Sequence, residues 1–478
     1  MAAMEAKMRA RKKSAPADDL GPQKVEEITG HPCLLALVVF TVTMVAVGTI
    51  AREGRKPDYT VGAAFGATPF MAHPATGWIA VALLSSVLLL GRQLSVGGAL
   101  VDLTARWRHV HVGRLASSSH VCVQIQRLSN PVLDVVGAAF GFCAEEDFYM
   151  IMAPICWWIF PFLQPFFYNL MLVTLLGLLV GDSLKDILYL PRPSHPKLWT
   201  HSHSKGTAEE YGMPSTHAMN AVSNSLIFSF CADGECGRHA VMGFDQSTLA
   251  VGAVAWVFGV CCSRLYLGVH TVDDIAIGCG LGALLARLWL LVHERVDELL
   301  DHGGPEVPVV MLGAIIGTLT LTRAKPPSWT PSHRQSANIS GLLSGLLLAM
   351  WATGKETQLP EQHPPSAFDA ASGWIVLARL GIGLGIIFGG EQIIKAVLVP
   401  LVSKLRDEPL GYKADRVYIP VKYLSQTWMA VGIITAPIAM SAVNVPTPGE
   451  ISVNSNATIE EIPAIFLAPL ARETAGFE

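Results

Sequence analysis

The sequence predicts an all-α protein, a polytopic bundle of membrane-spanning helices. Of its 478 residues, 51% are hydrophobic and only 15% are charged, whereas a soluble domain has about a quarter charged residues. The mean hydropathy is +0.42. Apolar runs approaching the roughly 20 residues that a helix needs to cross a bilayer recur along the chain. The excess of apolar side chains therefore predicts surfaces that face lipid.

The N-terminal part is predicted to be a tail followed by membrane segments. Residues 1–32 are polar and lack the apolar core of a signal peptide, which predicts a disordered cytosolic tail. Residues 33–125 contain a span at 34–50 and a weaker one at 78–91. The mixed basic and apolar stretch at 92–146 suits a helix in the membrane interface, with a surface loop as the alternative.

The remaining chain is predicted to divide into a core, further spans and a tail. The core, residues 126–295, is expected to contain about five to six helices, and residues 296–445 about four additional spans. Core segments are expected at 148–163, 168–190, 217–231, 247–262 and 274–291. Later spans are expected at 307–321, 339–351, 374–390 and 428–443. Residues 446–478 form an acidic tail.

A histidine and a carboxylate stand where one apolar segment ends and the next begins. His270 and Asp274 are one helical turn apart, and Arg264 precedes them. At this spacing the carboxylate can hold one ring nitrogen and leave the other free to attack. The pattern is typical of a histidine nucleophile.

Two earlier stretches add groups of the kind that bind phosphate. Lys185 and Arg192 lie about two helical turns apart, so both can point to one side. Residues 214–217 supply Ser215 and His217 at the start of another apolar segment. Snorkelling cations at a membrane surface would explain single basic residues, but not three such stretches at segment ends. Together they provide the donors that a phosphate monoester site needs.

Several other classes of site are disfavoured. The net charge of −4 and the scattered basic residues argue against a nucleic-acid partner. His195, His201 and His203 lack neighbouring cysteine or carboxylate ligands, so we expect a mobile loop over the site there, and no metal or cofactor. Cys231 and Cys236 flank a hydrophilic loop where a disulfide is conceivable.

The three stretches resemble the motifs of the type 2 phosphatidic acid phosphatase superfamily. They read KxxxxxxRP at 185–193, PSxH at 214–217 and SRxxxxxHxxxD at 263–274. The wording Pro-Ser-Thr-His and the extra spans after Asp274 are closer to the sphingosine-1-phosphate (long-chain base phosphate) phosphatases of the endoplasmic reticulum. The resemblance is specific over about residues 125–295.

This resemblance implies a metal-independent integral-membrane enzyme that dephosphorylates sphingoid-base 1-phosphates through a phosphohistidine. It implies His270 as nucleophile, Asp274 as its orienting group and His217 as general acid. The groups implied to bind the phosphoryl oxygens are Lys185, Arg192, Ser215, Thr216 and Arg264. The alternatives are a broader phosphatidate or isoprenyl phosphate phosphatase, and a non-catalytic lipid-phosphate transporter or scaffold.

The membrane face of the site is predicted differently by two arguments. The basic residues of the loops favour the cytosolic face by the positive-inside rule. The resemblance implies the lumenal face of the endoplasmic reticulum, which follows if residues 78–91 do not span. We expect the lumenal face. The sequence does not indicate an oligomeric state.

Overall fold

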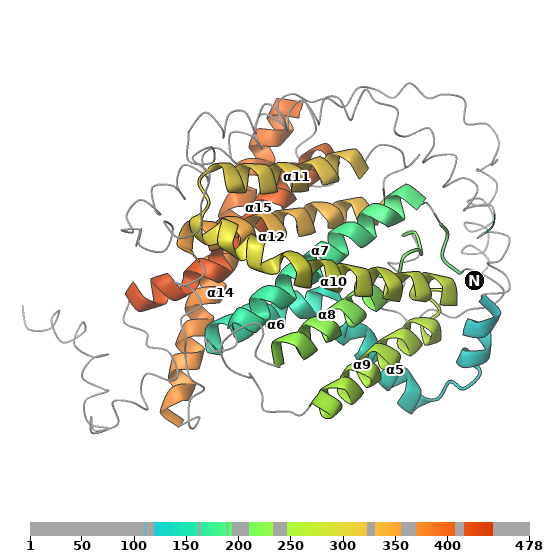
Figure 1. The fold of residues 1–478 in the computed structure, drawn as a ribbon. Helices are drawn as coiled ribbons and strands as arrows, with labels where there is room; N and C mark the ends of the chain where they lie inside the picture. Colours follow the sequence, from blue (N-terminus) through green and yellow to red (C-terminus); the bar gives the residue numbers. More distant parts are fainter. Residues whose placement is uncertain are drawn as a thin grey trace, which may run out of the picture.

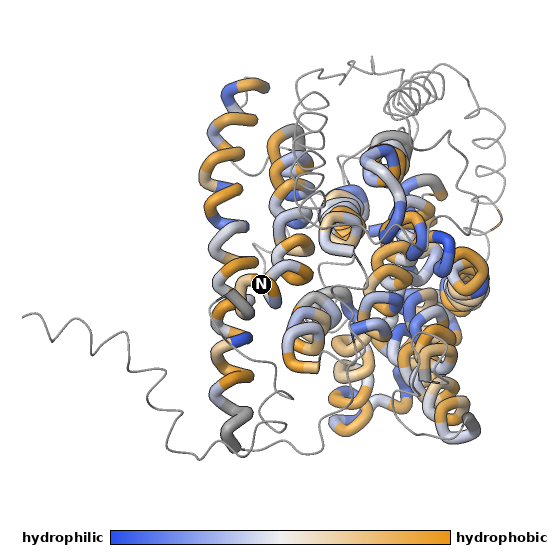
Figure 2. The backbone as a smooth tube through the Cα atoms, turned by 60° about the vertical axis from the view of Figure 1, so that its left-hand side comes forward, coloured by the Kyte–Doolittle hydropathy of each residue, from blue (hydrophilic) through white to orange (hydrophobic). Residues whose placement is uncertain are grey.

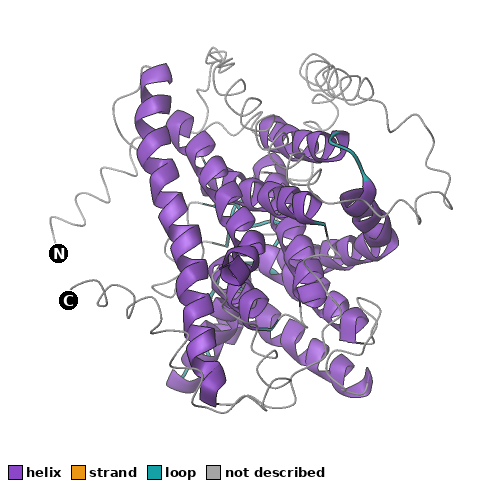
Figure 3. Ribbon diagram, turned by 90° about the vertical axis from the view of Figure 1, so that its left-hand side faces the viewer, coloured by secondary structure: helices purple, strands orange, loops and turns teal. Residues whose placement is uncertain are grey.

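The structure is a computed structural model, and the residues it describes are almost all helical (Figures 1 and 3). The described residues are 110, 119–160, 164–188, 190–193, 210–232, 246–322, 330–354, 370–406 and 415–442. The predicted spans at 34–50 and 78–91, the two tails and most of the loop at 194–212 lie outside them. No strand occurs among the described residues, so the all-α prediction is confirmed there.

The helices follow one another in the order predicted from the apolar segments. Residues 119–126 are helical, so this part of the mixed basic and apolar stretch is not a surface loop. The first labelled helices are α5 (Pro131–Cys143), α6 (Glu146–Ile159), α7 (Gln164–Leu188), α8 (Thr216–Ala232) and α9 (Gln246–Tyr266). They are followed by α10 (Val272–His302), α11 (Glu306–Thr322), α12 (Pro331–Thr353), α14 (Ala370–Arg406) and α15 (Asp415–Ala442).

Helices long and apolar enough to cross a membrane identify the chain as a multi-pass membrane protein. Within the described ranges, five qualify: α7, α9, α10, α12 and α14. The helices α5 and α11 are apolar but shorter. Hydrophobic positions recur along the helical tube in Figure 2. Some of these side chains are exposed, for example Phe258 of α9 and Trp374 of α14, as expected of helices in contact with lipid.

The C-terminal helices extend beyond the predicted segments. α12 begins at Pro331 rather than at 339, because its first turns carry polar residues that lower the hydropathy but are buried in the bundle. α14 continues to Arg406 rather than ending at 390, and α15 begins at Asp415 rather than at 428. Of the four C-terminal spans predicted, α12 and α14 meet the length and apolarity of a span. Hydropathy alone therefore misplaces the ends of buried helices.

α8 lies against α7, α9 and α10, and glycines allow the close approach. A Cβ at Gly181 of α7 would collide with the Thr216 side chain, and one at Gly278 of α10 with the Ser215 carbonyl. A Cβ at Gly282 would meet the backbone of Met219. The missing side chains bring the first turn of α8 between its neighbours.

α12 is the central helix of the C-terminal half and makes its most extensive contact with α15. Gly341 and Gly345 of α12 approach the carbonyls of Tyr423 and Thr427 so closely that a Cβ would clash. Small residues at such spacing allow membrane helices to pack tightly. α12 also packs on α7, which joins this half to the helices around α8.

Candidate active site

His270 lies in the turn that joins α9 to α10. Gly268 in this turn has a φ of 68°, a left-handed conformation that a residue with a Cβ seldom adopts. The Val269 amide donates to the Arg264 carbonyl over 3.2 Å and closes the end of α9. The chain therefore reverses direction directly before His270.

The first turn of α10 fixes the carboxylate of Asp274. The Thr271 hydroxyl accepts a hydrogen bond from the Asp274 amide (3.2 Å), and Asp274 Oδ2 accepts one from the Thr271 amide (2.7 Å). This reciprocal pair is a capping box. The Asp274 carbonyl also accepts from the Ser215 amide at 3.1 Å, which ties α10 to the residue before α8.

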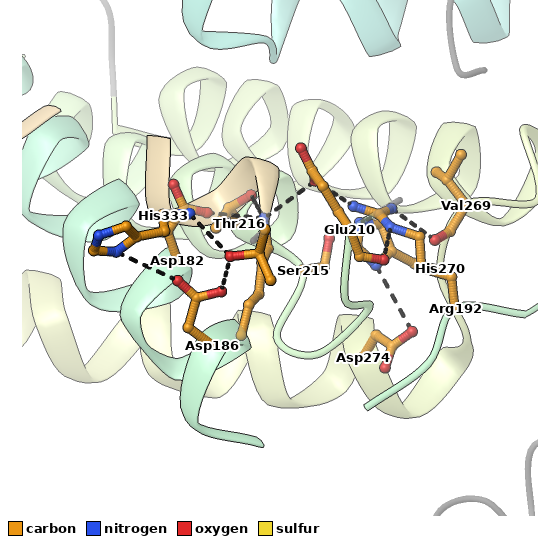
Figure 4. Close-up of polar contacts among 12 residues, drawn as sticks. Asp182, Asp186, Arg192, Glu210, Ser215, Thr216, Val269, His270, Asp274 and His333 are labelled. Atoms are coloured by element: carbon orange, nitrogen blue, oxygen red, sulfur yellow. Dashed lines mark hydrogen bonds and ion pairs between the residues drawn. The ribbon is translucent and has the colours of Figure 1, made fainter. Parts of the chain in front are cut away.

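The two ring nitrogens of His270 face different groups (Figure 4). Nδ1 lies 3.7 Å from Asp274 Oδ2, a close electrostatic contact longer than a hydrogen bond. Nε2 lies 3.4 Å from a terminal nitrogen of Arg192. The ring is 1% exposed. One nitrogen thus faces an orienting carboxylate, and the other faces the basic groups of the site.

The surroundings of His270 favour its neutral form. Burial lowers the pKa of His270 well below its ordinary value of 6.5, and the positive charges of Arg192, Arg264 and Lys185 lower this pKa further. A hydrogen bond with the Gly212 backbone opposes them without reversing the direction. A neutral imidazole has a free electron pair, so His270 meets the first requirement of a nucleophile.

The predicted phosphate-binding cations converge on His270. Lys185 Nζ donates to Asp182 Oδ1 at 2.9 Å and to the Thr216 hydroxyl at 3.3 Å. Arg192 donates to the Val269 carbonyl at 2.9 Å, which aims its guanidinium at the turn that holds His270. Arg264 is 2% exposed, and its positive charge acts on His270.

The first turn of α8 supplies the remaining predicted residues. Ser215 and Thr216 are buried at its N-terminus, where helix amides favour an anion. His217 interacts electrostatically with His270, Arg264 and Lys185. Its buried Nε2 has no hydrogen-bond partner among the described residues. All eight residues predicted for the site therefore lie in one polar cluster.

Glu210 also belongs to this cluster, although it was not among the residues predicted from the sequence. Its carboxylate accepts a hydrogen bond from Arg192 at 2.8 Å and lies 3.9 Å from Lys185 Nζ. Its carbonyl accepts from Arg192 Nε at 3.3 Å. The only signal in the sequence was an acidic residue two positions before Gly212, in the stretch that opens the second motif.

The carboxylate of Asp186, the residue after Lys185, connects the site to α12. Asp186 accepts a hydrogen bond from the Thr330 hydroxyl at 2.7 Å, and its other oxygen lies 4.0 Å from His333 Nδ1. Thr330 is also the N-cap of α12, since its hydroxyl accepts from the His333 amide. The C-terminal half therefore contacts the helix that carries Lys185.

Among the described residues, no metal cluster accompanies the site, and an apolar cavity lies apart from it. The described residues contain no group of three or more histidine, cysteine or acidic side chains that could hold a metal ion. His195, His201 and His203 lie outside them. An apolar cavity of about 140 Å³ lies between α6, α7, α12 and α15, and the residues that line it include none of the polar cluster. The clustered charges therefore identify the site.

Comparison with known proteins agrees with this geometry. Residues 166–298, which contain all three motifs, match the family model of the PAP2 superfamily. The chain is 30% identical to mouse sphingosine-1-phosphate phosphatase 2 over 310 residues, which cover 62% of this chain and 82% of that protein.

More distant relatives come from a plant and a yeast. Identity is 26% with lipid phosphate phosphatase delta of Arabidopsis thaliana, over 62% of this chain and 71% of the plant protein. It is 25% with a dihydrosphingosine 1-phosphate phosphatase of Saccharomyces cerevisiae, over 47% of this chain and 54% of the yeast protein. No solved structure matches the chain. With the matched motifs gathered around His270, the chain belongs to the PAP2 superfamily and is a phosphatase.

Proposed function

We propose that this protein hydrolyses sphingoid-base 1-phosphates in the endoplasmic reticulum membrane, through a phosphohistidine and without a metal. The substrate class follows from the names of the relatives in mouse and yeast. The observation that carries the mechanism is the position of His270, between the carboxylate of Asp274 and the guanidinium of Arg192. We further propose that the site faces the lumen.

In the first step, His270 Nε2 attacks phosphorus while the bond from phosphorus to the lipid oxygen breaks. Asp274 stabilises the positive charge that develops on the ring through its contact with Nδ1. His217 takes up a proton from solvent when the phosphoryl dianion binds, and gives this proton to the departing alkoxide. Five basic and polar side chains stabilise the phosphoryl oxygens, namely those of Lys185, Arg192, Arg264, Ser215 and Thr216.

In the second step, water attacks the phosphohistidine and the nitrogen–phosphorus bond breaks. His217, now neutral, accepts the proton of the attacking water, and inorganic phosphate leaves with His270 restored to its neutral form. Each imidazole thus returns to its starting state, with the lipid alcohol and phosphate as the two products. No electron transfer is involved.

Hydrolysis by the purified protein tests this proposal. With EDTA present, the wild type should release phosphate from sphinganine 1-phosphate, and His270→Ala should lower the rate about a thousandfold or more, as loss of a nucleophile does. The matched control is His120→Ala, since His120 is exposed and outside the cluster. A rate that disappears in EDTA and returns with Mg²⁺ would contradict the metal-free mechanism.

A panel of substrates in the same assay separates the alternatives. If phosphatidate and isoprenyl phosphate are hydrolysed faster than sphinganine 1-phosphate, the protein is the broader phosphatase. Binding of all three lipids without turnover would indicate a transporter or scaffold instead.

A further inference from the structure

The carboxylate of Glu210 occupies the place where a phosphoryl group is proposed to bind. Its Oε2 lies 2.8 Å from Arg192 and 3.9 Å from Lys185, so it contacts two of the proposed phosphate-binding cations at once. In Figure 4 it extends between the Thr216 side of the cluster and the side of Arg192 and His270. Glu210 has no part in the proposed chemistry, and its position therefore requires a separate explanation.

Glu210 differs from the other acidic residues of the cluster in its exposure. Asp182 is fully buried against Lys185, and Asp274 is fully buried against His270 and the α10 amides. The Glu210 side chain is 16% exposed, more than Lys185 at 3% or Arg192 at 10%. It is therefore the carboxylate of this cluster that a substrate can reach.

An anion at this point penalises a substrate that carries only phosphate. A phosphoryl dianion bound to Arg192 and Lys185 displaces Glu210 from these cations and leaves two negative groups close together in a buried site. A cation beside the phosphate ester would remove this repulsion. Sphingoid-base 1-phosphates carry such a cation, because their second carbon bears an ammonium group next to the phosphorylated carbon.

We infer that Glu210 is a specificity-determining residue that binds the ammonium group of the substrate. This inference rests on the proposed function. On binding, the phosphoryl group takes over Arg192 and Lys185, and the Glu210 carboxylate turns to the ammonium one carbon away from the ester. The site then prefers phosphates with a neighbouring amine over phosphates that lack one.

Two substrates that differ only in the amine test this role. The first is sphinganine 1-phosphate, and the second is the same chain with hydrogen in place of the amine. Glu210→Gln keeps the shape of the side chain and removes its charge. For this variant we expect kcat/KM to fall about tenfold or more for the amine substrate, as expected for the loss of a buried charge pair, and to stay equal or rise for the amine-free one.

Two variants complete the design. Glu298→Gln makes the same chemical change in an exposed ion pair with Arg295, outside the cluster, and should leave kcat/KM for both substrates unchanged. Glu210→Asp keeps the charge and should retain the preference for the amine substrate. This variant still tests the role of Glu210 if Glu210→Gln does not fold. Thermal unfolding in detergent identifies variants that are misfolded.

The outcomes distinguish this inference from the proposed function. A wild type that hydrolyses neither substrate contradicts the proposed function itself. If both are hydrolysed and Glu210→Gln lowers kcat/KM equally for both, Glu210 only orients Arg192 and the inference is wrong. The inference is also wrong if both Glu210→Asp and Glu210→Gln keep full activity and the wild-type ratio of kcat/KM between the two substrates.

Discussion

At the residue scale, the side chains of the site are arranged around a neutral imidazole. Burial lowers the pKa of His270, and the positive charges of Arg192, Arg264 and Lys185, the cations proposed to bind phosphate, add to this effect. The same positive charges therefore have two consequences. In the proposed mechanism they hold the phosphoryl oxygens, and before the substrate arrives they favour the neutral form of His270.

This arrangement predicts the acid side of the pH profile. Because the pKa of His270 is lowered, its ring stays neutral as the pH falls through 6.5 and becomes protonated only at lower pH. The loss of kcat/KM on acidification should then follow the second ionisation of the substrate phosphate, with a pKa of about 6. Phosphorus NMR of the lipid in the same detergent gives this ionisation independently. An additional protonation near the ordinary histidine pKa would show that His270 is not held neutral.

The sequence could predict most of the site because its residues occur in short motifs with fixed spacing. His270 and Asp274 are neighbours on one turn, and their approach follows from local geometry. Glu210 could not be selected in this way. Its partners precede it by 18 residues or more, Lys185 on α7 and Arg192 beyond the end of α7. In the sequence Glu210 directly follows Glu209, and such a pair is typical of a surface loop.

At the element scale, the site depends on how closely three helices approach. α8 begins with Thr216 and is held by α7 and α10 through glycines. Gly278 faces the Ser215 carbonyl, whereas the neighbouring Gly280 has no atom within 4 Å of a built Cβ. These two glycines of one helix therefore provide a matched test of the packing.

Gly278→Ala should move the first turn of α8 away from α10. We expect overpacking to lower the free energy of unfolding by about 1–3 kcal/mol, and kcat/KM to fall because Ser215 and His217 shift relative to His270. Gly280→Ala should leave both unchanged or slightly raise stability, since alanine favours a helix. Activity assays and thermal unfolding of both variants measure these effects. Equal behaviour of the two would mean that the close approach is not required.

Helix ends were harder to predict than helix positions, and α12 shows why. Ser332, Ser336, Ser340 and Ser344 recur at every fourth position, and all are fully buried. Ser344 accepts a hydrogen bond from Tyr423 at 2.8 Å. Hydropathy assigns such serines to a surface, whereas in a membrane bundle small polar residues line helix contacts. The predicted segment therefore began only at 339.

At the scale of the whole molecule, the C-terminal helices are connected to the site. Thr330 caps α12 and donates to Asp186, one residue after Lys185. α12 in turn packs on α15, which packs on α14. The apolar segments predicted C-terminal spans without a reason for their presence, because the contact joins residues 144 positions apart.

The membrane face of the site is the property on which the observations disagree. The structure records Cys231 in a disulfide; the sequence made one with Cys236 conceivable, and Cys236 lies outside the described residues. Cys231 lies about 22 Å along α8 from Thr216, at 1.5 Å a residue, so it marks the face opposite the site if α8 crosses the membrane as the sequence predicts. Disulfides persist in oxidising compartments, which favours a cytosolic site, as the loop charges do. The resemblance favours a lumenal site, which follows if residues 78–91, outside the described residues, do not span the membrane.

Our proposal of a lumenal site predicts two results in sealed microsomes. A protease tag inserted in the loop at 194–209 should be cleaved only after detergent is added, because the loop joins Arg192 to Glu210 at the site. Cys231 lies on the cytosolic face in that case, so it should be reduced in cells. It should then react with a membrane-impermeant thiol reagent added to the sealed microsomes. A tag in the C-terminal tail, which we place opposite the site, serves as the control and should be cleaved without detergent. The opposite result is cleavage of the loop tag in intact microsomes, together with a Cys231 that reacts with the reagent only after reduction. That result would place the site in the cytosol and show that the charge rule outweighs the resemblance.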